Sequence, residues 1–249
     1  NLPEVPDLAI ITIPAQVLLD VLVEMGEKKI KNVVVLSAGF KEIGPEGLEL
    51  ENKLKDISEK YGINLLGPNC LGFVNNQLPV NATFGKVIPQ VGSMRFILQS
   101  GAIATSLFDW CGSMNLGFSE FITLGNKAVL NESDALEYFF DKSENNITSL
   151  VGKSSDQIHP IGLYLESISD GPRFIQITKQ IAQHDPIFIL KPGKTTAASG
   201  AMQSHTGAIA GDNDVLNAVF KQTGIIRCDT LEDFFDLSKA FSWGTIPKG

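Results

Sequence analysis

The sequence predicts an α/β protein of two domains with mostly parallel sheets. Short apolar runs alternate with segments of helical periodicity along the chain, which is the pattern of βαβ units. Turns of small residues directly follow several of the apolar runs, at the position where ligands bind in open α/β sheets. With 249 residues, the chain is long enough for about two domains with ordinary cores.

The first part of the chain contains predicted strands separated by predicted helices. Apolar residues recur at helical spacing in the first helix, and Gly62 follows the second at a position where glycine commonly ends a helix. In order, the elements are strand 8–13, helix 16–26, strand 32–36, helix 47–61 and strand 64–66. The stretch at 78–92 has Pro and Gly residues near its end, which predict a boundary between a domain at 1–88 and a domain at 89–249.

The remaining part repeats this alternation. Its elements are strand 94–98, helix 101–111, strand 117–123, helix 134–140, strand 161–165, helix 173–183, strand 186–191, helix 214–222, an apolar pair at 225–226 and helix 231–241. Residues 141–157 are polar and rich in Asn and Ser, so we expect an exposed loop or insertion there. A second loop, rich in Gly, Thr, Ala and Ser, is expected at 193–205.

Charge and cysteine content argue against several classes of protein. The 28 acidic and 20 basic residues give a net charge of −8, whereas a binder of duplex nucleic acid needs a basic face. No apolar run approaches the ~20 residues of a membrane span, and no signal-like segment opens the chain. The three cysteines form no C-x-x-C pair, which argues against a disulfide scaffold and a structural metal. We therefore expect a cytoplasmic protein without a metal of its own.

A turn of small residues follows the predicted strand 94–98. Ser100, Gly101 and Ala102 leave the first backbone N–H groups of the next helix uncovered, and with the helix dipole these groups can hold an anion. The alternative is an ordinary serine N-cap beside a glycine. The turn alone does not decide between them.

A histidine and a glutamate are candidates for catalysis. His205 lies in a predicted flexible loop, in the sequence Ser204-His205-Thr206-Gly207, where a neutral imidazole could take a phosphoryl group. Glu166 ends the predicted strand 161–165, where a carboxylate could hold a histidine in one tautomer. The alternatives are a surface histidine and a solvated edge residue. His159 and His184 lie in turn-like contexts and are interpreted as structural.

Small-residue turns also follow the predicted strands of the first domain, at 13–15, 37–40 and 67–70. Side by side along one edge, they would form a crevice for an extended cofactor, and a generic Rossmann crevice is an equal alternative. Cys70 has no histidine close in sequence to activate it, so we interpret it as structural. The chain contains neither a complete G-x-G-x-x-G nor a P-loop motif.

Taken in order, the motifs cover nearly the whole chain. They are IPA at 13–15, SAGF at 37–40, GPNCLG at 67–72, QSGA at 99–102, TLGNKA at 123–128, YLE at 164–166 and SHTGAIAG at 204–211. This ordered set resembles the α part of NDP-forming acyl-CoA synthetases, relatives of the succinyl-CoA synthetase α subunit. The resemblance implies an incomplete Rossmann-type CoA-binding domain followed by a flavodoxin-like succinyl-CoA-synthetase domain.

The resemblance also implies roles for individual residues. His205 corresponds to the histidine that is transiently phosphorylated, and Glu166 to its carboxylate partner. The helix N-terminus that holds phosphate corresponds to Ser100, Gly101 and Ala102. The residues implied to face CoA lie in the turns of the first domain: Pro14, Ala15, Ala38, Gly39, Phe40 and Asn69.

The implied reaction has three steps: ATP phosphorylates His205, the phosphoryl group passes to a carboxylic acid substrate, and the CoA thiol displaces phosphate from the acyl phosphate. ATP, ADP and Mg²⁺ would be held by an ATP-grasp subunit or domain, in a hetero- or homo-oligomer. The chain alone is therefore expected to be inactive.

Two departures from the family pattern accompany the resemblance. The chain begins at Asn1, downstream of the family's opening strand and Gly-rich turn, which suggests a fragment or processed chain. The sequence also shows no ATP-grasp part of the kind that binds the nucleotide in the family. In addition, residues 141–157 are longer than the usual connection. The alternative function is a non-catalytic, synthetase-like regulatory region of a protein lysine acetyltransferase. A generic NAD-binding enzyme is a more distant alternative, because its fingerprint glycines are not recognisable.

Overall fold

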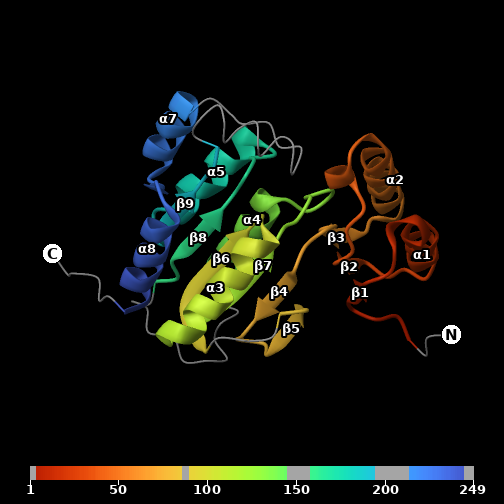
Figure 1. The fold of residues 1–249 in the computed structure, drawn as a ribbon, viewed down its shortest axis with the longest axis horizontal. Coiled ribbons are helices and arrows are strands. Elements are labelled where there is room, and N and C mark those ends of the chain that lie inside the picture. Colours follow the sequence, from red (N-terminus) through yellow and green to blue (C-terminus); the bar gives the residue numbers. More distant parts are fainter. Residues whose placement is uncertain (1–3, 86–89, 145–157, 194–212, 244–249) are drawn as a thin grey trace.

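The chain folds around two separate β-sheets. A computed structural model describes residues 4–85, 90–144, 158–193 and 213–243. Within these residues, the three-stranded sheet has the order β1-β2-β3, and the seven-stranded sheet has the order β10-β9-β8-β6-β7-β4-β5 (Figure 1). The predicted α/β class is confirmed.

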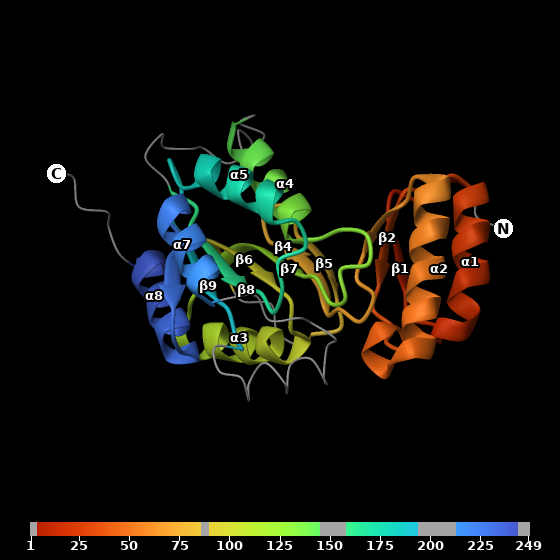
Figure 2. The ribbon, with the colours of Figure 1, turned by 90° about the horizontal axis from the view of Figure 1, so that it is seen from above.

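The smaller unit is a parallel sheet with two helices on one face. β1 (Ala9–Ile11), β2 (Asn32–Val35) and β3 (Asn64–Leu66) pair in parallel. They are connected by α1 (Ala15–Glu27) and α2 (Pro45–Tyr61), which lie side by side in Figure 2. Because the strands are parallel, the turns that follow them collect at a single edge of this sheet.

The larger sheet is built on β6 (Val91–Leu98). This strand pairs in parallel with β7 (Phe118–Thr123) on one side and β8 (Ile161–Tyr164) on the other. β9 (Ile187–Leu190) and β10 (Ile226–Cys228) extend the sheet beyond β8, again in parallel. Five strands therefore end at the same edge.

Helices cover both faces of the larger sheet (Figure 2). α4 (Glu132–Glu144), α5 (Gly171–Ile181) and α7 (Asn213–Thr223) pack against one face. α3 (Gly101–Met114) and α8 (Leu231–Trp243) pack against the other. None of the helices in the described part of the chain combines the length and apolar character needed to cross a bilayer.

An antiparallel hairpin at one end of the larger sheet was not predicted. β4 (Gly72–Asn75) pairs with β5 (Val80–Thr83) and also with β7. Its strands are too short and too polar to stand out as apolar runs. Asn75 Oδ1 accepts the backbone N–H groups of Gln77 (3.0 Å) and Leu78 (2.9 Å), so a side chain closes the turn.

The hairpin also affects where the two units divide. The chain passes from the smaller to the larger sheet between Leu66 and Gly72, upstream of the boundary predicted at 88/89. Residues 141–144 form the end of α4 instead of the expected loop, and residues 145–157 lie outside the described part. The other predicted strands and helices are confirmed, with shifts at their ends.

Candidate functional site

The carboxyl ends of β6, β7, β8 and β9 form one edge of the larger sheet. Leu98 of β6 is in register with Thr123 of β7 and Tyr164 of β8, so the residues that follow these strands are neighbours. A cavity of about 580 Å³ opens at this edge. Its walls include predicted site residues from both units: Asn69, Ser100, Gly101, Ala102 and Glu166.

The N-terminus of α3 forms one wall of this cavity. Ser100 is the N-cap, and its side chain accepts the backbone N–H of Ile103 at 3.5 Å. The helix offers no acceptor to the N–H groups of Gly101 and Ala102, because the first N–H groups of a helix lack an intrahelical partner. A Cβ added to Gly101 would meet no atom within 4 Å. The N-cap and anion-site interpretations are therefore compatible, and the end of the helix is open to a ligand.

Glu166 lies beside this helix end, directly after β8. It is 8% exposed, and its Oε2 has no hydrogen-bond partner among the described residues. Its backbone is fixed, because its N–H donates to Gln99 Oε1 at 2.9 Å and its carbonyl accepts from Lys191 Nζ at 2.7 Å. A buried acceptor without a donor is costly, so this oxygen is placed to receive a hydrogen bond from another group.

Two buried lysines lie near Glu166. Lys127 forms an ion pair with Glu132 at 2.8 Å and donates to the carbonyl of Ser167 at 2.8 Å. Burial lowers the pKa of Lys127, and the charge of Glu132 opposes that shift. Burial also lowers the pKa of Lys191, while the charge of Glu166 opposes the shift. The two ammonium groups bring positive charge to this part of the cavity, which suits a site for anions.

The turns of the smaller unit meet at the carboxyl ends of its strands. Gly39 has φ +106°, and a Cβ there would lie 3.2 Å from the Cβ of Ala15, so the turns after β1 and β2 touch. The backbone N–H of Asn69 donates to the carbonyl of Ser37 at 2.9 Å, which adds the turn after β3. The hydroxyl of Ser37 is buried without a described partner, and Ala38 is exposed. Small side chains and an unused hydroxyl fit the edge of a CoA site.

Not every predicted residue lines the same space. Pro14, Ala15, Ala38 and Gly39 lie at the edge of the smaller sheet and not around the cavity at α3. The side chain of Phe40, which precedes η1 (Lys41–Ile43), is fully buried in the apolar core of the smaller unit, so only its backbone is available at this turn.

Two further predictions concern a cysteine and a histidine. Burial raises the pKa of Cys70 to about 12, and its thiol donates to the carbonyl of Val35 at 3.4 Å, so its structural interpretation fits the geometry. His205 lies outside the described residues, so its position is not part of this geometry.

Several residues of the site were not singled out from the sequence. Gln99, Asn126 and Lys127 belong to motifs of the resemblance, and Lys191 ends a predicted strand. Their position after strands was the available signal. What a single sequence does not reveal is the partner of each: Gln99 contacts a loop 67 residues away.

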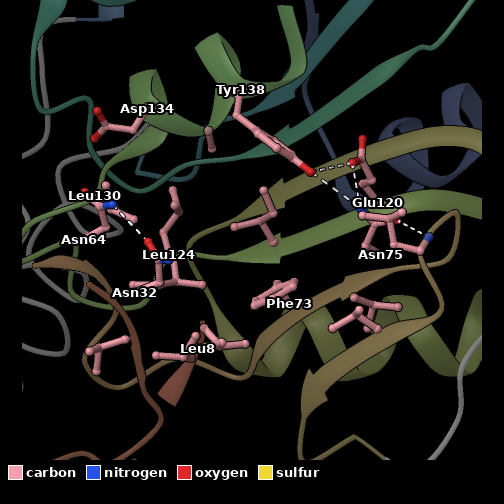
Figure 3. Close-up of a pocket in the computed structure, with 18 of the residues that line it drawn as sticks. Leu8, Asn32, Asn64, Phe73, Asn75, Glu120, Leu124, Leu130, Asp134 and Tyr138 are labelled. Carbon is pink, nitrogen blue, oxygen red and sulfur yellow. Dashed lines mark hydrogen bonds between the residues drawn. The ribbon is translucent and has the colours of Figure 1, made fainter. Parts of the chain in front are cut away.

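A second cavity, of about 600 Å³, lies between the two sheets and is mainly apolar (Figure 3). Phe73 and Leu124 are among its lining residues. Its polar groups already bond to one another: Asn75 Nδ2 and the hydroxyl of Tyr138 each donate to Glu120 Oε1 at 3.1 Å. None of the predicted site residues lines it.

Comparisons with known proteins agree with the two-unit architecture. A family model described as a succinyl-CoA ligase like flavodoxin domain matches residues 91–241, and one described as a CoA binding domain matches residues 1–76.

Among the relatives are an ADP-forming acetate–CoA ligase from Archaeoglobus fulgidus and an ADP-forming acetate–CoA ligase α subunit from Pyrococcus furiosus. The first is 39% identical over 96% of this chain and 33% of the relative, and the second is 38% identical over 100% and 51%. The solved structure of the dinucleotide-forming acetyl-coenzyme A synthetase 1 from Ca. Korarchaeum cryptofilum, in complex with phosphate and ADP, is 36% identical with a TM-score of 0.88. That match covers 100% of this chain and 51% of the other. The chain thus spans about a third to a half of these proteins.

Proposed function

The chain belongs to the α-subunit family of ADP-forming acyl-CoA synthetases, and from this membership we propose that it is the CoA- and phosphate-handling part of an acid–CoA ligase. The observation that carries the proposal is the Oε2 of buried Glu166, which has no partner within the described part of the chain and lines the same cavity as the open N-terminus of α3. A buried carboxylate oxygen that accepts no hydrogen bond from the described residues, in the same cavity as the N–H groups that open a helix, suits a phosphorylated histidine.

In this proposal His205 is the nucleophile. One imidazole nitrogen attacks the γ-phosphorus of ATP, an N–P bond forms, and the P–O bond to ADP breaks. A carboxylate oxygen of the acid substrate then attacks the same phosphorus, which breaks the N–P bond and gives an acyl phosphate. The CoA thiolate attacks the acyl carbon and expels inorganic phosphate. Splitting the reaction in this way stores the driving force of ATP in a covalent intermediate.

Glu166 and α3 support the phosphoryl transfer steps. Glu166 Oε2 accepts a hydrogen bond from the second imidazole nitrogen of His205, which leaves the first nitrogen free to attack and stabilises the positive charge of the phosphorylated ring. The N–H groups of Gly101 and Ala102 hold the phosphoryl oxygens. The turns around Ala15 and Gly39 hold CoA.

Gly101 offers a test of the phosphate site that leaves the fold intact. Since a Cβ at Gly101 meets nothing within 4 Å, leucine there projects into the cavity without a backbone clash. We expect Gly101→Leu to slow incorporation of labelled phosphate from ATP by at least about 10-fold, through lost electrostatic stabilisation, with an unchanged melting temperature.

Gly171 is a matched control for this substitution. It also opens a helix, α5, and a Cβ there also meets nothing within 4 Å, but it does not line the cavity. Gly171→Leu should leave phosphoryl transfer at the wild-type rate. Equal rates in Gly101→Leu and Gly171→Leu would remove the phosphate site from the N-terminus of α3.

The nucleotide is proposed to bind to a partner subunit or domain of the ATP-grasp type, which holds ATP, ADP and Mg²⁺. We expect the purified 249-residue chain to form no acyl-CoA from ATP, acid and CoA, and activity to appear when the partner is added. Thioester formation is measured by its absorbance. Robust synthesis by the chain alone would contradict the division of labour. The relatives named for acetate make a short-chain carboxylic acid the proposed substrate class.

A further inference from the structure

Asn126 lies in the turn after β7, a motif to which the proposed function gives no role. Its side chain is buried, at 6% exposed. Its Nδ2 donates to Glu42 Oε2 at 2.6 Å and to Glu51 Oε2 at 2.8 Å, while its Oδ1 accepts from Asn69 Nδ2 at 3.3 Å. These partners all belong to the smaller unit, so this amide from the larger unit joins the two.

The backbone of the same turn is also held by the smaller unit. The N–H of Asn126 donates to the carbonyl of Pro68 at 2.9 Å, and the carbonyl of Asn126 accepts from Lys41 Nζ. At Gly125, a Cβ would lie 2.3 Å from the carbonyl oxygen of Pro68, so only glycine permits this approach. Main chain and side chain therefore fix Asn126 against the smaller unit.

Glu42 links Asn126 to the CoA-side turn. Its second oxygen, Oε1, accepts the backbone N–H groups of Gly39 at 2.5 Å and Phe40 at 3.1 Å. Burial pushes the pKa of Glu42 upward, but the hydrogen bonds from Asn126, Gly39 and Phe40 outweigh burial and leave the pKa below its ordinary value. Glu42 is therefore a carboxylate with donors on both sides, and Asn126 supplies the donor from the larger unit.

The residue after Asn126 reaches the other half of the site. Lys127 Nζ donates to the carbonyl of Ser167, the neighbour of Glu166. A single turn therefore holds the Gly39–Phe40 segment through one side chain and the Glu166 loop through the next.

We propose that Asn126 is a positioning residue for CoA, which acts through Glu42 to hold the Gly39–Phe40 turn in place against the phosphate-binding end of α3. This inference rests on the proposed role of that turn in CoA binding. It assigns to Asn126 no contact with CoA and no part in phosphorylation of His205.

Asn126→Asp tests the inference at nearly constant side-chain size. It replaces the donor by a carboxylate that faces Glu42 and Glu51, with Lys41 and Lys127 as the neighbouring cations. Like charges at hydrogen-bond distance repel, so the contact between residue 126 and Glu42 should break. In the full enzyme with its nucleotide-binding partner, we expect the Kd for CoA at pH 8 to rise by about tenfold or more. A tenfold change corresponds to an interaction strong enough to shift a pKa by about one unit.

The variant should also acquire a distinctive pH dependence. Repulsion by Glu42 and Glu51 raises the pKa of the new aspartate, which therefore takes up a proton as the pH falls. The protonated carboxyl restores a donor, and the ratio of variant to wild-type Kd should therefore shrink between pH 8 and pH 5.5. A ratio that is independent of pH would contradict the repulsion on which the inference depends.

Asn75 provides a matched control. It is also buried, and its Nδ2 donates to Glu120 Oε1 at 3.1 Å, but in the apolar cavity away from the CoA-side turn (Figure 3). Asn75→Asp should leave the Kd for CoA unchanged. If Asn126→Asp does not fold, Glu42→Gln tests the inference instead. The amide nitrogen of the glutamine would face a donor, either Asn126 Nδ2 or the N–H groups of Gly39 and Phe40, so this variant should also weaken CoA binding.

The outcomes separate the two levels of the argument. Wild-type CoA affinity in the folded variants Asn126→Asp or Glu42→Gln would overturn the positioning role alone. A wild-type enzyme that does not bind CoA would overturn the proposed function and this inference with it. Weakened CoA binding in Asn126→Asp, with wild-type affinity in Asn75→Asp, supports both.

Discussion

Replacement of His205 by alanine is expected to abolish phosphoryl labelling of the enzyme reconstituted with its nucleotide-binding partner. The substitution removes the imidazole nitrogen that forms the N–P bond in the proposed mechanism. The measurement is acid-labile label retained on the chain after a short incubation with ATP labelled at the γ-phosphate. Acyl-CoA synthesis should disappear in the same variant.

A second histidine supplies the control. His184 is exposed after α5 and lies away from the cavity at α3. His184→Ala should take up label at the wild-type rate, which excludes a general effect of histidine loss. Acid-labile label that persists in His205→Ala would place the nucleophile elsewhere.

Replacement of Glu166 by glutamine is expected to slow histidine phosphorylation by ~10²-fold or more, by analogy with other carboxylates that orient a catalytic imidazole. Glutamine keeps the shape of the side chain but removes the charge that stabilises the imidazolium. Its Nε2 can also occupy the place of Oε2, the buried acceptor without a described partner. The rate constant is measured in a single turnover, before substrate acid and CoA are added.

Glu137→Gln is the control for loss of a carboxylate charge. Glu137 is partly exposed on α4, where it pairs with Arg173, and such surface pairs contribute little to stability. The variant should phosphorylate at the wild-type rate. Full-rate phosphorylation in Glu166→Gln would end the role of Glu166 while leaving His205 as the nucleophile.

The alternation of apolar runs and helical periodicity is enough to predict most of the fold. Periodicity reports which face of an element is buried, and this property is local in sequence. The hairpin of β4 and β5 was not predicted, because its turn is closed by the side chain of Asn75 and because its pairing with β7 joins segments far apart in the chain. The passage of the chain to the larger sheet before β4 was not predicted either, because it also depends on the pairing of β4 with β7.

In the candidate site too, features that are local in sequence were predictable, whereas contacts between distant residues were not. Ser100, Gly101 and Glu166 were predictable, because each follows a strand and such residues collect at one edge of a parallel sheet. The buried position of the Phe40 side chain was not predicted, since its neighbours in a small-residue turn do not reveal that the ring packs into the core. The contact of Asn126 with Glu42 spans 84 residues and could not be read from one sequence.

Mapping the phosphorylated residue of the wild-type protein tests the central claim most directly. The chain is incubated with its nucleotide-binding partner and γ-labelled ATP, digested under alkaline conditions and analysed by mass spectrometry. The account predicts one acid-labile phosphoryl group on the peptide that contains His205, which is lost when ADP, or the acid and CoA, are added. A chain that binds CoA but takes up no label, as a regulatory module would, or a phosphoryl group on any other residue, would contradict the account.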